Sequence, residues 1–209
     1  MKHRFWMLAL LFAIELCVIM LLVPGQWTEQ VIESEANLTK RSLGQSSVVW
    51  IHDKASLWYT HLVENTDILG AMHRFLIPSE EQRLASTGIE DMGSGFFVWW
   101  DNRIEALGYL IYQVLVRFAL LLMWLPYIAA LAIPAVFDGW MTWKIKRTNF
   151  DYASPIVHRY STRGITTAVF GLLVVFFLPI AIDPIIVPVV LMLIAVLLGL
   201  SAGNLQKRI

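Results

Sequence analysis

Cysteine and catalytic motifs are nearly absent from this sequence of 209 residues. The single cysteine, Cys17, lies inside an apolar stretch, so a disulfide framework is excluded. The sequence contains no G-x-x-x-x-G-K-S/T phosphate loop and no H-E-x-x-H zinc motif. It also lacks a serine–lysine dyad and paired carboxylates of the kind that enzymes use for acid–base work. We therefore expect a protein that is not an enzyme and that binds no cofactor and no metal.

Charge is scarce as well. Only 15% of the residues are charged, against about 25% in soluble domains, whereas 57% are hydrophobic. Four apolar stretches, at 5–23, 107–137, 165–182 and 185–203, approach the length of about 20 residues that a spanning helix needs. The sequence therefore predicts an all-α integral membrane protein with four transmembrane helices. Because the 16 basic and 16 acidic residues cancel, the net charge gives no sign of nucleic-acid binding.

The few charges are unevenly distributed between the apolar stretches. Segments 1–4, 138–164 and 204–209 carry nine Lys or Arg against two acidic residues, whereas segment 24–106 carries six against twelve. Since basic flanks stay in the cytoplasm, we expect both termini inside and one small helical domain on the outer side of the membrane. The predicted layout is an anchor at 1–23, a periplasmic domain at 24–106, a second span at 107–137, a basic cytoplasmic loop at 138–164, a transmembrane hairpin at 165–203 and a cytoplasmic tail at 204–209.

The first stretch has features of both a signal peptide and an anchor. Its basic start and apolar run fit either. Against a signal peptide, Glu15 interrupts the run and Val23-Pro24-Gly25 offers no A-x-A-like cleavage site. We therefore expect an uncleaved anchor.

Two ionisable residues lie inside predicted spans. Glu15 is about ten residues from the inner face and Arg117 is about as far from the outer face. Because the two helices run in opposite directions, the side chains reach similar depths and are candidates for an ion pair. The alternatives are a charge relay or pore lining, and a protonated Glu15 with Arg117 extended toward the outer interface.

The loop at 138–164 is basic and aromatic. Its cations are placed to meet anionic headgroups, and a proline at the first helical position is typical of a helix start. Two readings stay open, membrane anchoring and a docking surface for a cytoplasmic partner. The candidate residues are Lys144, Lys146, Arg147, Ser154, Pro155, His158, Arg159 and Arg163.

The last two spans form a helical hairpin. Its predicted tip contains Pro179, Asp183 and Pro184, which leave no room for a domain between the spans. Gly199 and Gly203 form a G-x-x-x-G motif, which lets two helices approach closely. We interpret this motif as a candidate for helix packing in an oligomer or with a partner.

The C-terminal part resembles a known family. The residues that carry the likeness are Tyr152-Ala-Ser-Pro155, His158-Arg159-Tyr160, Leu178-Pro179-Ile180 and Ile182-Asp183-Pro184, followed by an apolar helix. Over about 152–188 the chain resembles inner-membrane proteins encoded in integrating conjugative elements and related conjugative plasmids. The resemblance implies a role in conjugation beside the type IV coupling protein, a hexameric ATPase that delivers DNA to the secretion channel.

The leading hypothesis is therefore a non-catalytic inner-membrane component of a conjugative type IV secretion system. Its expected partners are the coupling ATPase or channel subunits together with membrane lipids, in several copies per assembly, and no direct sequence-specific contact with nucleic acid. The alternative is a small transporter or channel, which Glu15, Arg117 and the proline-broken helices would suit. The absence of an inverted repeat weighs against that alternative.

Overall fold

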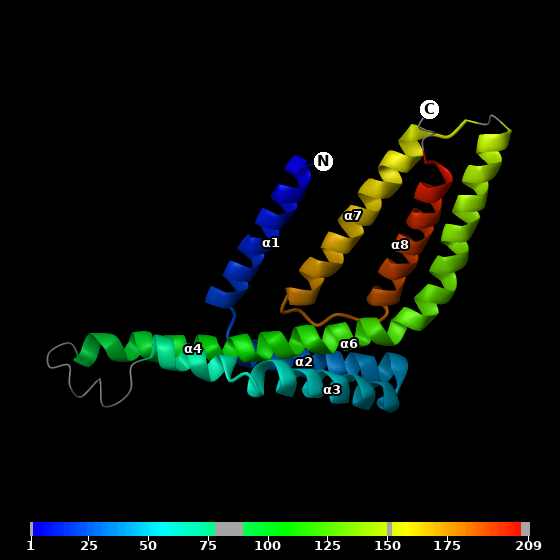
Figure 1. The fold of residues 1–209 in the computed structure, drawn as a ribbon. Coiled ribbons are helices and arrows are strands. Elements are labelled where there is room, and N and C mark those ends of the chain that lie inside the picture. Colours follow the sequence, from blue (N-terminus) through cyan, green and yellow to red (C-terminus); the bar gives the residue numbers. More distant parts are fainter. Residues whose placement is uncertain (1, 78–89, 150–151, 206–209) are drawn as a thin grey trace. The chain divides into compact units, whose positions relative to one another are not determined.

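The computed structural model describes residues 2–77, 90–149 and 152–205. The predicted tail cations Lys207 and Arg208 lie outside these residues. The described residues form helices and no strand, so the predicted all-α class is confirmed for them. The helices are α1 (Lys2–Leu22), α2 (Gly25–Leu43), α3 (Gln45–Tyr59) with a π-helical turn (Thr60–Glu64), α4 (Ile68–Leu76), α6 (Glu90–Thr148), α7 (Pro155–Phe177) and α8 (Ile186–Gly203) (Figure 1).

Three described helices are long and apolar enough to cross a membrane. They cover Gly95–Thr148, Pro155–Phe177 and Ile186–Gly203. A fourth candidate is the pair Trp6–Leu22 and Gly25–Leu43, whose two helices meet at 111°. Three or four candidate spans agree with the predicted membrane protein.

The chain divides into two compact units. The first contains Met1–Ala119 with Phe176–Ile182, and the second contains Leu120–Val175 with Asp183–Ile209. Helix α6 contributes its first half to one unit and its second half to the other. The helix has no break near residue 107, where the second span was expected to begin.

In the first unit, α2 and α3 lie beside the first half of α6 (Figure 1). Gly44 joins α2 to α3 with φ of 88°, a left-handed conformation that glycine adopts without strain. The buried face of α2 is one stripe at helical spacing, formed by Thr28, Val31, Glu35 and Thr39. Three of these four residues are polar, so this buried face needs polar partners.

In the second unit, α7 and α8 accompany the second half of α6. Helix α6 continues through Pro126 and Pro134. Many large apolar side chains are exposed here, including Ile133 on α6 and Val189 on α8. An apolar surface of this kind is expected where helices face lipid.

Candidate functional site

A buried ion pair joins α2 to α6 in the first unit. Arg117 Nη2 donates to Glu35 Oε1 at 2.6 Å, and Arg117 Nε lies 3.1 and 3.3 Å from the two carboxylate oxygens. The two side chains are only 4% and 7% exposed. The planar guanidinium and the carboxylate therefore meet in the two-pronged geometry that makes such pairs strong.

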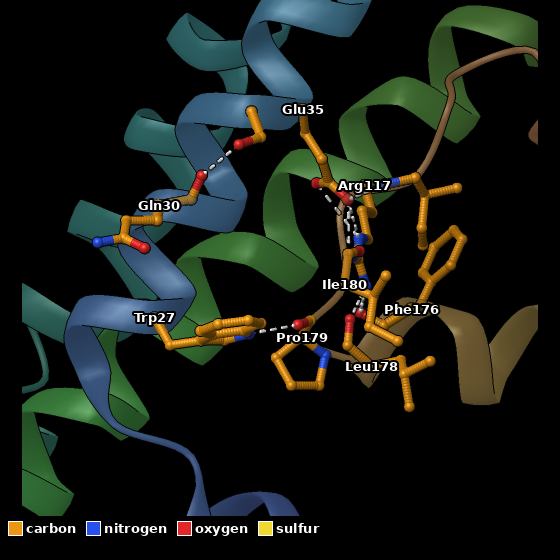
Figure 2. Close-up of polar contacts among 10 residues, drawn as sticks. Trp27, Gln30, Glu35, Arg117, Phe176, Leu178, Pro179 and Ile180 are labelled. Atoms are coloured by element: carbon orange, nitrogen blue, oxygen red, sulfur yellow. Dashed lines mark hydrogen bonds and ion pairs between the residues drawn. The ribbon is translucent and has the colours of Figure 1, made fainter.

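The same pair also binds the segment that follows α7. Arg117 Nη1 donates to the carbonyls of Phe176 and Leu178, and Nη2 donates to that of Ile180, each at 2.8 Å. Glu35 Oε1 accepts from the backbone N–H of Ile182 at 3.0 Å. Figure 2 shows Arg117 at the centre of these contacts.

A third side chain fastens the same segment. Trp27 Nε1, near the start of α2, donates to the Pro179 carbonyl at 2.8 Å (Figure 2). The segment 178–185 is not helical, so its backbone groups lack helical partners and need others when buried. Trp27, Glu35 and Arg117 supply those partners, and we call this set of contacts the polar clamp.

The polar clamp holds structure rather than performing chemistry. The donors of Arg117 are directed at the Glu35 carboxylate and three backbone carbonyls. A guanidinium suits this task because it presents several donors in a fixed fork, which a lysine ammonium does not. The arrangement fixes the α7–α8 connection to α2 and α6.

The structure gives Arg117 a partner other than the predicted Glu15. Glu35 occupies that place, while both carboxylate oxygens of Glu15 are buried without a hydrogen-bond partner among the described residues. The depth argument assumed a span from residue 107, whereas α6 packs on α2 as far as Arg117. The sequence did contain a signal that Glu35 is buried, because Glu35 lies on the same helical face as the apolar Val31.

A second polar contact joins α3 to α6. His52 Nδ1 lies 3.0 Å from the Tyr112 hydroxyl. Burial lowers the pKa of His52, with a smaller opposing effect of Asp53, so the imidazole is neutral at pH 7. Burial also raises the pKa of Tyr59, helped by Glu64 and Tyr109. These groups hold the first unit together.

The predicted hairpin-tip residues have structural contacts. The Pro179 carbonyl belongs to the polar clamp. Asp183 Oδ1 accepts from the backbone N–H of Ile185 at 3.0 Å, just before α8, and Pro184 is fully buried. The tip is therefore tied down by its own side chains as well as by the clamp.

Several cations and polar groups of the basic loop contact the end of α8. Lys146 Nζ donates to the Gly203 carbonyl at 3.3 Å and to Asn204 Oδ1 at 3.0 Å. The backbone N–H of Ser154 also donates to Asn204 Oδ1, at 3.3 Å. A positive charge at a helix C-terminus is favourable because the carbonyls there carry partial negative charge.

His158 contributes to the same packing. Its Nδ1 lies 3.0 Å from the Ser201 carbonyl and 3.1 Å from the Ser201 hydroxyl. The Ser154 hydroxyl accepts from the Val157 N–H at 3.4 Å, so Ser154 caps α7, whose first residue is Pro155. Ser154 and His158 thus join the start of α7 to the end of α8, and Lys146 joins the end of α6 to the same end of α8.

The other loop cations lie against aromatic rings or in the open. Lys144 Nζ is 4.1 Å from the Trp140 ring centroid. Arg147 lies over Trp143 at 5.6 Å, and Arg163 lies over Tyr160 at 5.9 Å. Arg159 is exposed. These four cations remain candidates for contact with lipid or a partner.

The glycine motif packs within the chain. A Cβ added to Gly199 would lie 2.7 Å from the Ala135 carbonyl oxygen of α6, and one added to Gly203 would lie 3.3 Å from that of Gly139. A Cβ at Gly139 would collide with the Gly199 carbonyl oxygen. The motif therefore serves α6–α8 packing in the second unit, where an oligomer or partner contact was expected.

The described residues contain no group of three or more His, Cys, Asp or Glu that could hold a metal ion. No curated protein and no solved structure matches the chain. The sequence profile of one family, described as IncC plasmid conjugative DNA transfer protein DtrJ-like, matches residues 22–208. This match extends over most of both units, from the end of α1 to beyond α8. The chain therefore belongs to the DtrJ-like family of conjugative DNA transfer proteins.

Proposed function

We propose that this protein is a non-catalytic inner-membrane component of a conjugative type IV secretion machine, which binds the coupling ATPase or a channel subunit. Family membership supports a role in conjugative DNA transfer, and the three or four candidate spans support a place in a membrane. The observation that carries the proposal is an exposed face at the start of α7. It is formed by Ile156, Arg159, Tyr160 and Arg163, and we call it the α7 face.

The α7 face is rigidly presented. Ile156 is three residues before Arg159 and four before Tyr160, and Arg163 follows these two at four and three residues, so all four lie on one side of the helix. The opposite side carries His158 and Thr162, which contact Ser201 of α8. Helix α7 is therefore held by its inner side while the α7 face stays free of that packing.

The composition of the α7 face suits a protein partner. Ile156 is 64% exposed and Tyr160 is 65% exposed, with Arg159 and Arg163 beside them. Arginine and tyrosine are enriched among residues that contribute most to protein interfaces. The positive-inside rule supports a cytoplasmic position for this face, on the side where the ATPase of the transfer machine would act. An acidic, partly apolar surface on the partner would complement it.

Charge reversal tests the proposal in donor cells. In a tagged protein, R159E with R163E should remove the coupling ATPase from the purified complex and lower conjugation frequency at least tenfold, while the protein remains in the membrane. The matched control is K54E, which reverses an exposed cation on α3. Unchanged co-purification and unchanged transfer would refute the proposal.

A second pair of variants separates a protein partner from lipid. R159K with R163K keeps the positive charge that anionic headgroups attract. It removes the planar fork that arginine uses to bind carboxylates. A protein partner predicts weaker co-purification for this variant, whereas simple anchoring predicts no change.

The alternative of a small transporter or channel retains one specific observation. Glu15 lies in α1 with both carboxylate oxygens buried and without a hydrogen-bond partner among the described residues. An intramembrane carboxylate of this kind is a usual element of proton and ion pathways. Solute or proton flux in liposomes containing the purified protein, abolished by Glu15→Gln, would favour this alternative.

A further inference from the structure

The first half of α6 carries an uncovered apolar stripe. Phe96, Trp100, Leu107, Ile111 and Val114 follow at intervals of four, seven, four and three residues, so they share one face of the helix. Phe96 is 55% exposed, and the other four are partly exposed. We call these five residues the α6 stripe. Ile104, Ala106 and Leu110, other residues of the same segment, are buried.

Arg103 shows which way the α6 stripe faces. It lies on the same helical face, three residues after Trp100 and four before Leu107. Its Nη1 donates to the carbonyl of Leu21, in the last turn of α1, at 3.3 Å. It also donates to the carbonyl of Val23, the first residue after α1, at 2.9 Å. The stripe side of α6 is therefore the side on which α1 ends.

The direction of α6 follows from its packing on α2. A Cβ at Gly25 would lie 3.3 Å from Ala106 Cα, and further along Glu35 binds Arg117. Ten residues separate the two positions on α2 and eleven separate those on α6, so the helices run side by side in the same direction for roughly 15 Å. Since α2 meets α1 at 111°, this part of α6 also crosses α1 steeply.

We propose that α6 lies in the plane of the outer membrane interface from Phe96 to about Ala119, with the α6 stripe in contact with lipid. The inference rests on α1 spanning the membrane and is independent of the proposed function. A helix perpendicular to a spanning helix, placed at its outer end, runs along the surface. An apolar stripe with aromatic residues toward the acyl chains is the pattern of interfacial helices.

The remaining part of α6 is long enough for the span. Helix α6 continues from Leu120 to Thr148, a length of roughly 43 Å at 1.5 Å per residue. The hydrocarbon core is only about 30 Å thick. Trp140 and Trp143 near the end of α6 then fall at the inner interface, where tryptophan is enriched.

Depth measurements along α6 test the proposal. Single cysteines replace Phe96, Leu107 and Ile111 in a full-length Cys17→Ser background. Each carries an environment-sensitive fluorophore in liposomes of phosphatidylethanolamine and phosphatidylglycerol, and spin-labelled lipids report its depth by quenching. The control for water is Ser34→Cys on the exposed side of α2, and the control for the acyl core is Ile133→Cys.

An in-plane helix predicts three labels at one shallow depth, within about 5 Å of one another. A helix that spans from residue 107 or before predicts depths that increase by roughly 1.5 Å per residue, about 22 Å between positions 96 and 111. That gradient would overturn the proposal. Labels that are shielded from both the lipid quencher and water would also overturn the proposal, because they would show that protein rather than lipid covers the α6 stripe. Gel filtration of each labelled protein checks that it is folded.

Discussion

The two halves of α6 pack by different means. Up to Ala119 the helix packs on α2, α3 and the segment 176–182, and it places Arg117 in the interior, paired with Glu35. From Leu120 onward it packs through small residues such as Gly139, and many of its large apolar side chains are exposed. The first half is therefore stabilised by polar contacts that require exact partners, and the second by close backbone approach.

This difference teaches how to interpret an apolar run longer than one span. Hydrophobicity alone does not separate a helix buried in protein from one buried in lipid. The polar residues do, because a buried ionic group survives only where a partner compensates its loss of hydration. In α6, Arg117 lies in the half that has such a partner, and no arginine or lysine occurs again before Lys144.

The largest effect is expected from breaking the polar clamp. Arg117→Met leaves the Glu35 carboxylate buried beside unpaired carbonyls, which should lower the free energy of unfolding by about 3–5 kcal/mol. Thermal unfolding in detergent measures the loss. Arg74→Met is the control, because Arg74 pairs with Asp67 on an exposed surface and such pairs contribute about 0–1 kcal/mol.

A double variant sharpens the same test. Glu35→Gln with Arg117→Met should lose less than the sum of the two single changes, since the pair is in direct contact. Glu15→Gln with Arg117→Met should lose the sum. The reverse pattern would restore Glu15 as the partner of Arg117.

The next effect concerns the small-residue packing of the second half. Gly139→Ala forces α6 away from the Gly199 carbonyl, so we expect a loss of about 1–3 kcal/mol. Gly171→Ala on α7 is the matched control, because a Cβ there meets nothing within 4 Å. Alanine also favours a helix more than glycine does, so the control should be neutral or stabilising. Equal losses at both positions would contradict close α6–α8 packing.

A smaller effect is expected at the end of α8. Lys146→Met removes the ammonium group that donates to the Gly203 carbonyl, which should lower the free energy of unfolding by about 0.3–1 kcal/mol. Lys144→Met removes a cation of the same loop that lies over a tryptophan ring instead. Thermal unfolding of the two variants compares the contacts, and a greater loss for Lys144→Met would argue against the cap.

The smallest effect is a pH dependence in the first unit. Burial lowers the pKa of His52 in the folded protein, so the unfolded chain binds the proton more tightly. The contribution of His52 to the free energy of unfolding should therefore be fully present above the ordinary histidine pKa of about 6.5. It should be lost as the pH falls below that value. The midpoint of thermal unfolding at pH 7.5 and pH 5.5 measures this change. In His52→Gln the change should be smaller, and an equal change would assign it to another group.

Much of the architecture was predictable from local patterns. Long apolar stretches indicated spanning helices because every backbone polar group in lipid needs an internal partner, which a helix provides. The motif residues in 152–188 indicated a conjugation-associated family, and the family match confirms that prediction. The serine–proline start of α7 was also predictable, since the cap and the proline act within one turn.

The sequence by itself determined the helical class, the apolar spans and the family. Only the tertiary structure decided that Arg117 binds Glu35, that Lys146 and His158 hold α8, and that Gly199 faces Gly139. Each of these contacts joins residues that are distant in the chain, 82 positions apart for Arg117 and Glu35. Helical periodicity shows which face of a helix needs a partner but carries no information on which distant segment supplies it. That choice depends on how the helices pack, and here it gave Arg117 the partner Glu35 in place of the predicted Glu15.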